Sequence, residues 1–463
     1  MKRHLAEETV IFVSILKWII FAAFIGAIVG LSTTGFLKAL SWGTEFSKSY
    51  SNFLFKNNYS YFFFLPLALF ISTVLTKYLA PDAEGHGTDK IIEAIHKRSG
   101  KIRALVVPVK LVATIITLVT GGSAGKEGPC AQIGAGLASV FADLIRVDDC
   151  DRKKIVICGI SAGFASVFGT PIAGAIFGLE VLCVGEILYD VLLPSFVAGI
   201  TGFRVTSILG EKYFHRQLNF IPVFSDSLFL KVLLAGVFFG MCSFLLIESL
   251  KNCEKFSKKL KIWKPFKGII GGAVLVGLAL LFSTKYLGLG LDSIKASLRG
   301  QNVEWYAFIL KIVFTSITLS FGGSGGIITP IFFIGTTSGA FFGNIIGGDI
   351  ATFSAIGLVS LLSGAANTPI AASIMSIELF GPKIAPYAVI SCIISFLMTG
   401  HRSVYPSQMI DFTKSSSLYL EGERTIEGVK AYFKPRGASL LEIFLKMKRK
   451  LSNKKNNQNS KSI

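Results

Sequence analysis

Two glycine-rich loops carry the residues of this chain that are best suited to bind a ligand. GGSAGKEGP (residues 121–129) and GGSGGIITP (residues 322–330) each stand between an apolar stretch and a new apolar helix that begins at or just after the proline. Glycine allows a tight turn that exposes successive N–H groups, and these groups form an anion site together with the dipole of a helix N-terminus. Proline suits the first helical turn because its missing N–H would be unpaired there. A single loop of this kind is more often only a tight helix crossing, but its repetition favours a small desolvated anion held between two loops.

A nucleotide-driven pump is not supported by the first loop. GGSAGK (residues 121–126) shares glycine and lysine with a phosphate-binding P-loop. That motif, however, requires Gly where Thr120 stands and Ser or Thr where Glu127 stands. The loop is therefore interpreted as a site for a free anion.

The two loops belong to an internal repeat. Residues 110–134 align without a gap on residues 311–335, and TPIAGAIFGLEVL from Thr170 matches TPIAASIMSIELF from Thr368 at nearly the same offset. Repeats of this kind indicate two related structural units. We expect halves at about 10–206 and 229–412, which form one membrane domain over 1–412, followed by a short basic tail over 413–463. Transporters built from repeats place the substrate at the repeat interface near the membrane midplane.

The elements that must position these loops are membrane helices. The chain has 51% hydrophobic and 16% charged residues, whereas soluble domains carry roughly 25% charged residues. A spanning helix needs about 20 apolar residues. Segments of that kind lie near 10–40, 60–80, 103–120, 188–206, 229–248, 268–284, 303–321 and 384–400. Shorter segments, broken by Gly and Pro, lie near 128–145, 154–167, 171–184, 329–346, 352–365 and 369–381. Broken helices are tolerated where they line a cavity, so the sequence predicts an all-α polytopic fold with its site on the short helices.

The net charge of +19 comes from basic clusters beside the apolar segments. The positive-inside rule predicts that these clusters are cytoplasmic, with both termini inside and the protein in the plasma (inner) membrane. Lipid headgroups are favoured over nucleic acid as their partner. The seven cysteines contain no CxxC pair, so we expect no disulfide framework, no metal site and no cofactor.

Four ordered motifs resemble the CLC family of chloride channels and proton-coupled chloride transporters. They are EGHGTD (84–89), GKEGP (125–129), GGIITP (325–330) and GHRSVYPSQ (400–408). The resemblance implies an inverted-repeat helical fold and a homodimer with a separate pore in each subunit. We expect this chain to lack the paired regulatory domains that some members carry, because the tail after Asp411 is short and basic. Chloride or a similar monovalent anion is the expected substrate. An enzyme is not expected because no catalytic constellation accompanies Glu127, and a cation transporter would need clustered intramembrane carboxylates.

Within this resemblance, Glu127 corresponds to the gating glutamate. A carboxylate at membrane depth on a helix N-terminus is costly unless it is functional, and a structural N-cap is the alternative. Tyr405 matches a tyrosine whose hydroxyl donates to the anion, although a belt residue at the membrane interface is the ordinary interpretation of such a tyrosine. His86 stands where many members have serine, and the alternative is that its ring points away. The full set expected to bind the anion is His86, Gly87, Thr88, Gly125, Lys126, Gly128, Gly326, Ile327, Ile328 and Tyr405.

The mode of transport depends on one position. Proton-coupled members generally have a second glutamate immediately after the glutamate matched here by Glu180, and this chain has Val181. We therefore expect a passive, channel-like conductance, with a proton-coupled antiporter as the alternative. Glu180 and Glu378 occupy equivalent repeat positions and are expected to bind nearby backbone N–H groups. Lys110 and Lys311 are expected to extend their long stems to the membrane interface.

Overall fold

The computed structural model describes residues 2–55, 60–211, 213 and 226–433 of the chain. Within these residues the two halves contribute eight α-helices each, in the same order. The first half contains α1 (Lys2–Phe55), α2 (Leu65–Tyr78), α3 (Thr88–Arg98), α4 (Val106–Val119), α5 (Glu127–Leu144), α6 (Asp149–Phe168), α7 (Pro171–Glu180) and α8 (Leu192–Ile208). The second half contains α9 (Asp226–Lys259), α10 (Lys264–Leu281), α11 (Leu291–Leu298), α12 (Ala307–Ser320), α13 (Ile328–Ile345), α14 (Ile350–Ala366), α15 (Pro369–Phe380) and α16 (Ala385–Met398). Most of the expected boundary between the halves, 207–228, falls outside the described residues.

The predicted spanning and broken segments all contain helices, but the division between the two kinds is partly wrong. Segments 103–120, 303–321 and 384–400 were expected to span and contain α-helices of 14 residues, whereas 329–346 was expected to be broken and contains an apolar α-helix of 18 residues. Six described helical segments are long and apolar enough to cross a membrane. Others are too short, because α7 has 10 residues and a helix of that length covers only about 15 Å of a roughly 30 Å hydrocarbon layer. The fold is therefore the all-α polytopic fold that the sequence predicts.

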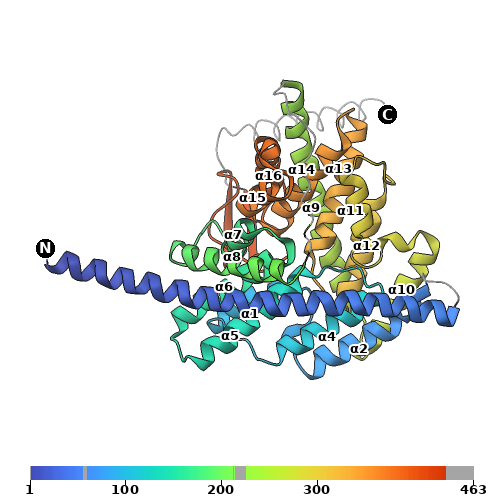
Figure 1. The fold of residues 1–463 in the computed structure, drawn as a ribbon. Helices are drawn as coiled ribbons and strands as arrows, with labels where there is room; N and C mark the ends of the chain where they lie inside the picture. The colour runs from blue at the N-terminus through green and yellow to red at the C-terminus, as the bar shows by residue number, and fades with distance from the viewer. Residues whose placement is uncertain (1, 56–59, 212, 214–225, 434–463) are drawn as a thin grey trace, which may run out of the picture.

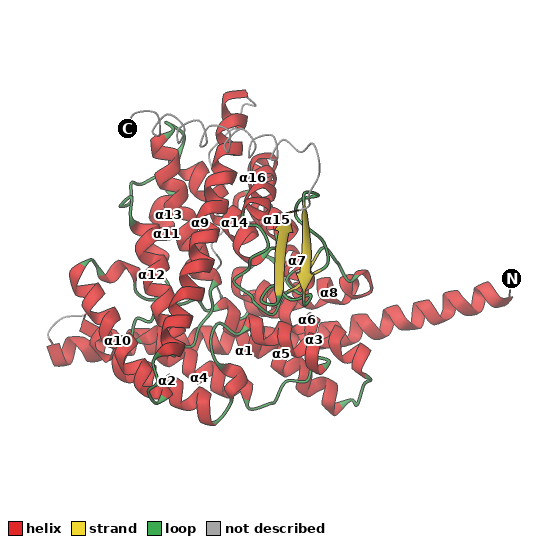
Figure 2. Cartoon of the chain, turned by 180° about the vertical axis from the view of Figure 1, so that it is seen from behind, coloured by secondary structure: helices red, strands yellow, loops and turns green. Residues whose placement is uncertain are grey.

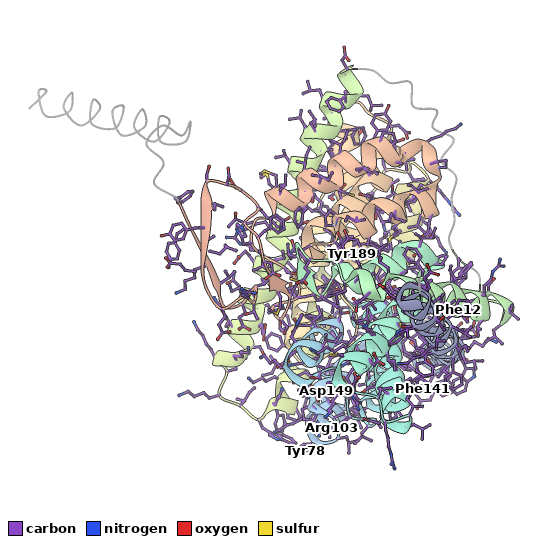
Figure 3. All side chains as sticks on the ribbon, turned by 90° about the vertical axis from the view of Figure 1, so that its left-hand side faces the viewer. Phe12, Tyr78, Arg103, Phe141, Asp149 and Tyr189 are labelled. Carbon is purple, nitrogen blue, oxygen red and sulfur yellow. The ribbon has the colours of Figure 1, made fainter. Side chains whose placement is uncertain are left out.

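The long helix α1 lies along one side of the molecule, and its N-terminal end projects beyond the remaining helices (Figure 1). Its surface is strongly apolar: Val10 is 69% exposed and Phe12, labelled in Figure 3, is 65% exposed. Contiguous exposed apolar surface is unfavourable in water. This part of α1 is suited to contact lipid.

Close helix crossings repeat in the two halves. A Cβ on Gly134 of α5 would lie 2.4 Å from the Gly159 carbonyl oxygen of α6, and a Cβ on Gly335 of α13 would lie 2.4 Å from the Gly357 carbonyl oxygen of α14. Small residues let membrane helices approach this closely. The equivalent glycines thus fix the same α5–α6 and α13–α14 packing in each repeat.

Short strands follow α7 and α16. Strand β1 (Cys183–Val184) pairs in parallel with β2 (Met409–Ile410), which joins the end of α7 to the segment after Tyr405. Strands β3 (Leu418–Gly422) and β4 (Val429–Phe433) form an antiparallel hairpin, drawn in yellow in Figure 2. The hairpin packs Leu420 and Val429 against a buried cluster that includes Phe396. The segment expected as a basic tail therefore begins with an ordered element, and its residues 434–463 lie outside the described part.

Candidate functional site

The two glycine-rich loops meet at the centre of the fold. Gly125 N donates to Gly326 O and Gly326 N donates to Gly125 O, each at 2.6 Å, which forms an isolated antiparallel bridge. The surrounding bonds are reciprocal as well, since Ser123 N donates to Thr318 Oγ1 and Ser324 N donates to Thr117 Oγ1, both at 3.1 Å. Helices α5 and α13 begin directly after this bridge. Two helix N-termini with their unpaired N–H groups are thereby brought together around a pseudo-twofold axis.

Residues 85–87, the loop that contains His86 and precedes α3, cover this junction and are called the His86 loop. A Cβ on Gly128 would lie 2.3 Å from the His86 carbonyl oxygen and 3.0 Å from Gly326 Cα. Only a residue without a side chain permits this approach. Gly85 O accepts from Gly325 N at 3.4 Å. Three of the four sequence motifs therefore converge at one place.

Glu127 lies at the junction and is 1% exposed. Its Oε2 accepts from Thr329 N at 3.2 Å and from the Thr329 hydroxyl at 2.5 Å. Thr329 belongs to the first turn of α13, so the carboxylate binds the helix of the other repeat rather than capping its own. Glu127 is thus not the N-cap residue of α5, but its bond to Thr329 N is a cap on α13, so the structural alternative stays beside the gating role. Gly125 makes room for the contact, because a Cβ there would lie 2.5 Å from Glu127 Oε2.

His86 and Tyr405 face each other beside this junction. Their ring centroids are 5.6 Å apart, and Tyr405 is fully buried. A belt residue at the membrane interface would be exposed, so that interpretation of Tyr405 is wrong. Neither the Tyr405 hydroxyl nor His86 Nδ1 has a hydrogen-bond partner among the described residues, although both atoms are buried. Buried polar atoms normally have partners, so these two atoms are suited to contact a ligand.

The other predicted residues surround the same place. Gly87 is the N-cap residue of α3 and Thr88 is its first residue, and Thr88 is 1% exposed. Lys126 is the N-cap residue of α5 and is partly buried. Ile327 and Ile328, each 1% exposed, precede Thr329 at the start of α13. Thr329 lies within residues 326–330, which were expected to line the pathway, but no individual role was predicted for it, since its only sequence signal was a hydroxyl next to the proline of the second loop.

Two fully buried lysines support the loops. Lys110 Nζ donates to Ala83 O at 3.2 Å and to Gly85 O at 2.6 Å. In the other repeat, Lys311 Nζ donates to Tyr286 O at 3.0 Å and to Gly288 O at 2.8 Å. The expectation that these lysines reach the membrane interface is wrong, because backbone carbonyls hold their ammonium groups inside the protein.

Glu180 and Glu378 bind each other's helices. Both oxygens of Glu180 accept from Ile370 N and Ala371 N at 2.9 and 2.8 Å, at the start of α15. The oxygens of Glu378 accept from Ile172 N and Ala173 N at 3.0 and 2.8 Å, at the start of α7. The expected bonding to backbone N–H groups is confirmed. The exchange also shows that α7 and α15 run antiparallel, as an inverted repeat requires.

The absence of a metal site stays a prediction. The ligand atoms of Cys183, Glu186 and Asp411 lie within 4.8 Å of one another at the ends of β1 and β2. The two carboxylates are exposed, and the Cys183 thiol donates to Asp411 Oδ2 at 3.4 Å. This arrangement is satisfied without an ion.

Comparison with known proteins agrees with the motifs. Residues 67–400 match the family model described as voltage gated chloride channel. The chain is 35% identical over 408 residues to the chloride/fluoride channel protein of Pseudomonas syringae pv. tomato. That alignment covers 86% of this chain and 88% of the relative. The crystal structure of a CLC-type fluoride/proton antiporter superimposes with a TM-score of 0.80 at 30% identity, over 86% of this chain and 98% of that one. A slow cyanobacterial Cl⁻/H⁺ antiporter has the same fold, with a TM-score of 0.72 at 20% identity over 82% and 94% of the two chains. The chain therefore belongs to the voltage gated chloride channel family, the CLC proteins.

Proposed function

We propose that this protein moves a small monovalent anion, fluoride or chloride, across a membrane in exchange for protons. The observation that carries the proposal is the buried Glu127 carboxylate, which lies where two helix N-termini meet. A carboxylate there occupies the surroundings that favour a free anion, so the two compete. Protonation removes the charge of the carboxylate and with it the competition.

The residues around Glu127 suit both of its protonation states. The Thr329 hydroxyl donates to the carboxylate, and a hydroxyl can also accept a hydrogen bond from a protonated carboxyl group. The Tyr405 hydroxyl and His86 Nδ1 are buried polar atoms without a hydrogen-bond partner among the described residues, and each can donate a hydrogen bond to an anion. Fluoride and chloride are monatomic acceptors that need only such donors. Transport rather than catalysis is the activity that these groups support.

Exchange is favoured over passive conductance by the similarity to a fluoride/proton antiporter over 86% of this chain. The second candidate is the passive channel expected from the sequence. Val181 favours it, because this residue is fully buried at the end of α7 and has no group that takes up a proton. A proton that reaches Glu127 from the Val181 end of α7 would need another carrier, such as a chain of water molecules.

The setting of the activity is also proposed. We infer a homodimer with one pathway in each subunit, located in the plasma (inner) membrane. The basic clusters favour cytoplasmic termini and contact with anionic lipid headgroups. No nucleic acid is expected to bind.

The test is ion movement in proteoliposomes that contain the purified protein. Fluoride or chloride release is recorded with an ion-selective electrode, and the voltage is fixed with potassium and valinomycin. An anion gradient should drive protons uphill when exchange operates. Anion release without uphill proton movement would establish the passive channel, and no release of either halide would refute the proposed function.

A further inference from the structure

The two repeats contain a third pair of equivalent segments. GHGTD (85–89) precedes and begins α3, and GLGLD (288–292) precedes and begins α11. The glycines correspond, since Gly85 and Gly87 have positive φ angles of 72° and 85°, and Gly288 and Gly290 have φ angles of 56° and 69°. Each segment ends on an aspartate at the second residue of its helix. The two carboxylates thus have the same position relative to a helix dipole.

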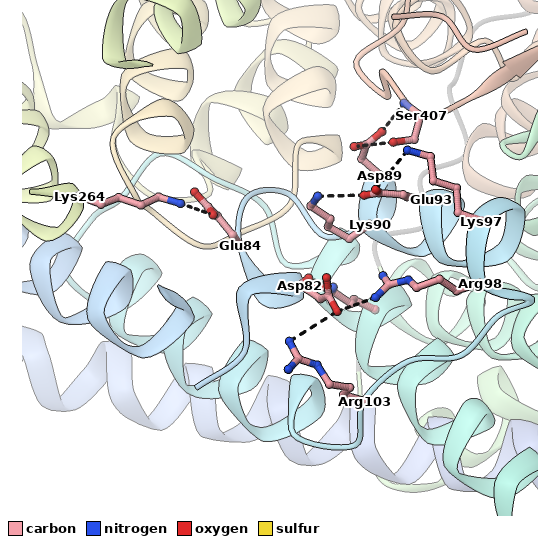
Figure 4. Close-up of polar contacts among 11 residues, drawn as sticks. Asp82, Glu84, Asp89, Lys90, Glu93, Lys97, Arg98, Arg103, Lys264 and Ser407 are labelled. Carbon is pink, nitrogen blue, oxygen red and sulfur yellow. Dashed lines mark hydrogen bonds and ion pairs between the residues drawn. The ribbon is translucent and has the colours of Figure 1, made fainter. Parts of the chain in front are cut away.

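Only the first of these aspartates has a partner far along the chain. Asp89 accepts from Ser407 N at 2.8 Å and from the Ser407 hydroxyl at 3.1 Å, as Figure 4 shows. Asp292 is exposed, and its side chain makes no hydrogen bond or ion pair among the described residues. Stabilising the start of a helix therefore does not explain the contact that Asp89 makes. The neighbouring Lys90 is paired with Glu93 at 3.0 Å, so Asp89 is not needed to balance its charge.

The contact joins the two segments that carry the unpaired donors. Ser407 follows Tyr405 by two residues, and the turn between them is closed by Gln408 N, which donates to Tyr405 O at 3.1 Å. Asp89 follows His86 by three residues. The two bonds from Ser407 therefore fix the Tyr405 backbone relative to the His86 loop. The ring centroid separation of 5.6 Å depends on that relation.

We propose that Asp89 is a positioning residue for anion binding, which acts through Ser407 by holding the Tyr405 hydroxyl opposite His86. The inference rests on the proposed function and adds the residue that determines the geometry of its donors. The two bonds from Ser407 to the Asp89 carboxylate restrict both the translation and the rotation of the turn over residues 405–408 relative to the His86 loop. Preorganised donors bind an anion more tightly than mobile ones, because less ordering is required on binding.

The experiment is calorimetric titration of the detergent-purified protein with potassium fluoride and potassium chloride. Asp89→Asn removes the charge that strengthens both bonds, and we expect about a tenfold loss of affinity for the bound halide. Asp292→Asn is the matched control, at the same helical position in the other repeat, and should leave the affinity unchanged. Ser407→Ala keeps the backbone donor and loses the hydroxyl, so its loss of affinity should be smaller than that of Asp89→Asn.

The decisive comparison uses Tyr405→Phe as the background. If Asp89 acts by placing the Tyr405 hydroxyl, Asp89→Asn should cause no further loss of affinity once that hydroxyl is absent. An equal further loss in the Tyr405→Phe background would overturn the inference, as would equal effects of Asp89→Asn and Asp292→Asn. If Asp89→Asn fails to fold, Ser407→Ala is compared in the wild-type and Tyr405→Phe backgrounds instead. An equal loss of affinity in both backgrounds would then overturn the inference. Absence of halide binding and flux in the wild-type protein would instead refute the proposed function.

Discussion

The exchanged glutamates Glu180 and Glu378 give a stability prediction whose size follows from their bonds. Each carboxylate accepts two backbone N–H bonds at 2.8 to 3.0 Å from the first turn of the opposite helix. The N-cap residues of those helices, Thr170 and Thr368, provide no side-chain cap of their own. Removing a carboxylate therefore leaves two N–H groups without their partner.

Glu180→Ala should destabilise the protein strongly. Hydrogen bonds to a charged group contribute about 1.5–3 kcal/mol each, so two such bonds give an expected loss of about 3–6 kcal/mol at a site that is 7% exposed. Glu180→Gln keeps one oxygen acceptor and should lose about half of that amount. Glu378 is less buried than Glu180, and solvent screens its bonds more effectively. Glu378→Ala should therefore cost less than Glu180→Ala.

The assay is reversible unfolding in mixed micelles, with the sodium dodecyl sulfate fraction as the variable and tryptophan fluorescence as the signal. Glu186→Ala, at an exposed position, is the control and should stay within about 0.5 kcal/mol of wild type. The two caps lie at opposite ends of short helices, so the effects of Glu180→Ala and Glu378→Ala should add. Equal stability of Glu180→Ala and Glu186→Ala would show that the exchanged caps do not hold the repeats together.

Three further predictions concern the anion pathway. Glu127→Ala should abolish the pH response of halide flux while the protein stays folded, because alanine cannot take up a proton; a wild-type pH profile in proteoliposomes would exclude Glu127 as the gate. Tyr405→Phe should weaken halide binding by about 0.5–3 kcal/mol, since one donor among several is lost, and an unchanged calorimetric affinity would mean that the hydroxyl does not touch the ion. His86→Ser should lower flux or change the preference between fluoride and chloride, because a serine hydroxyl and a neutral imidazole N–H present different hydrogen-bond donors to the anion. Identical flux ratios for wild type and variant would indicate that the imidazole does not line the pathway.

Much of the architecture could be predicted because the duplication is visible in the sequence. The matched segments 110–134 and 311–335 contain the end of one helix, a glycine loop and the start of the next helix, and the fold has the same elements in both halves. Apolar length located the helices but did not always give their lengths, because α4, α12 and α16 have 14 residues each although their segments were expected to span. The convergence of the two loops followed from the repeat itself.

The rest depends on contacts that no local pattern records. Helices α3 and α11 are short and only partly apolar, so a search for apolar runs does not find them. The partner of Glu127 is Thr329, which lies 202 residues away and does not occupy the equivalent repeat position. Lys110 has the composition of an interfacial lysine, and only the folded loop supplies the carbonyl groups that hold it. The sequence identifies the charged side chains, whereas their hydrogen-bond partners are determined by tertiary packing.

The reciprocal bonds of Glu180 and Glu378 have a consequence for how this architecture arose. In an isologous dimer of a single ancestral repeat, the same glutamate of each copy would cap the same helix of the other copy. Both bonds would then be present before the gene was duplicated and fused. Fusion would join the two chains while leaving their mutual caps intact, and it would free each copy to diverge. His86 in the first half and Leu289 in the second are one such divergence, because only the first copy has a polar side chain at this position.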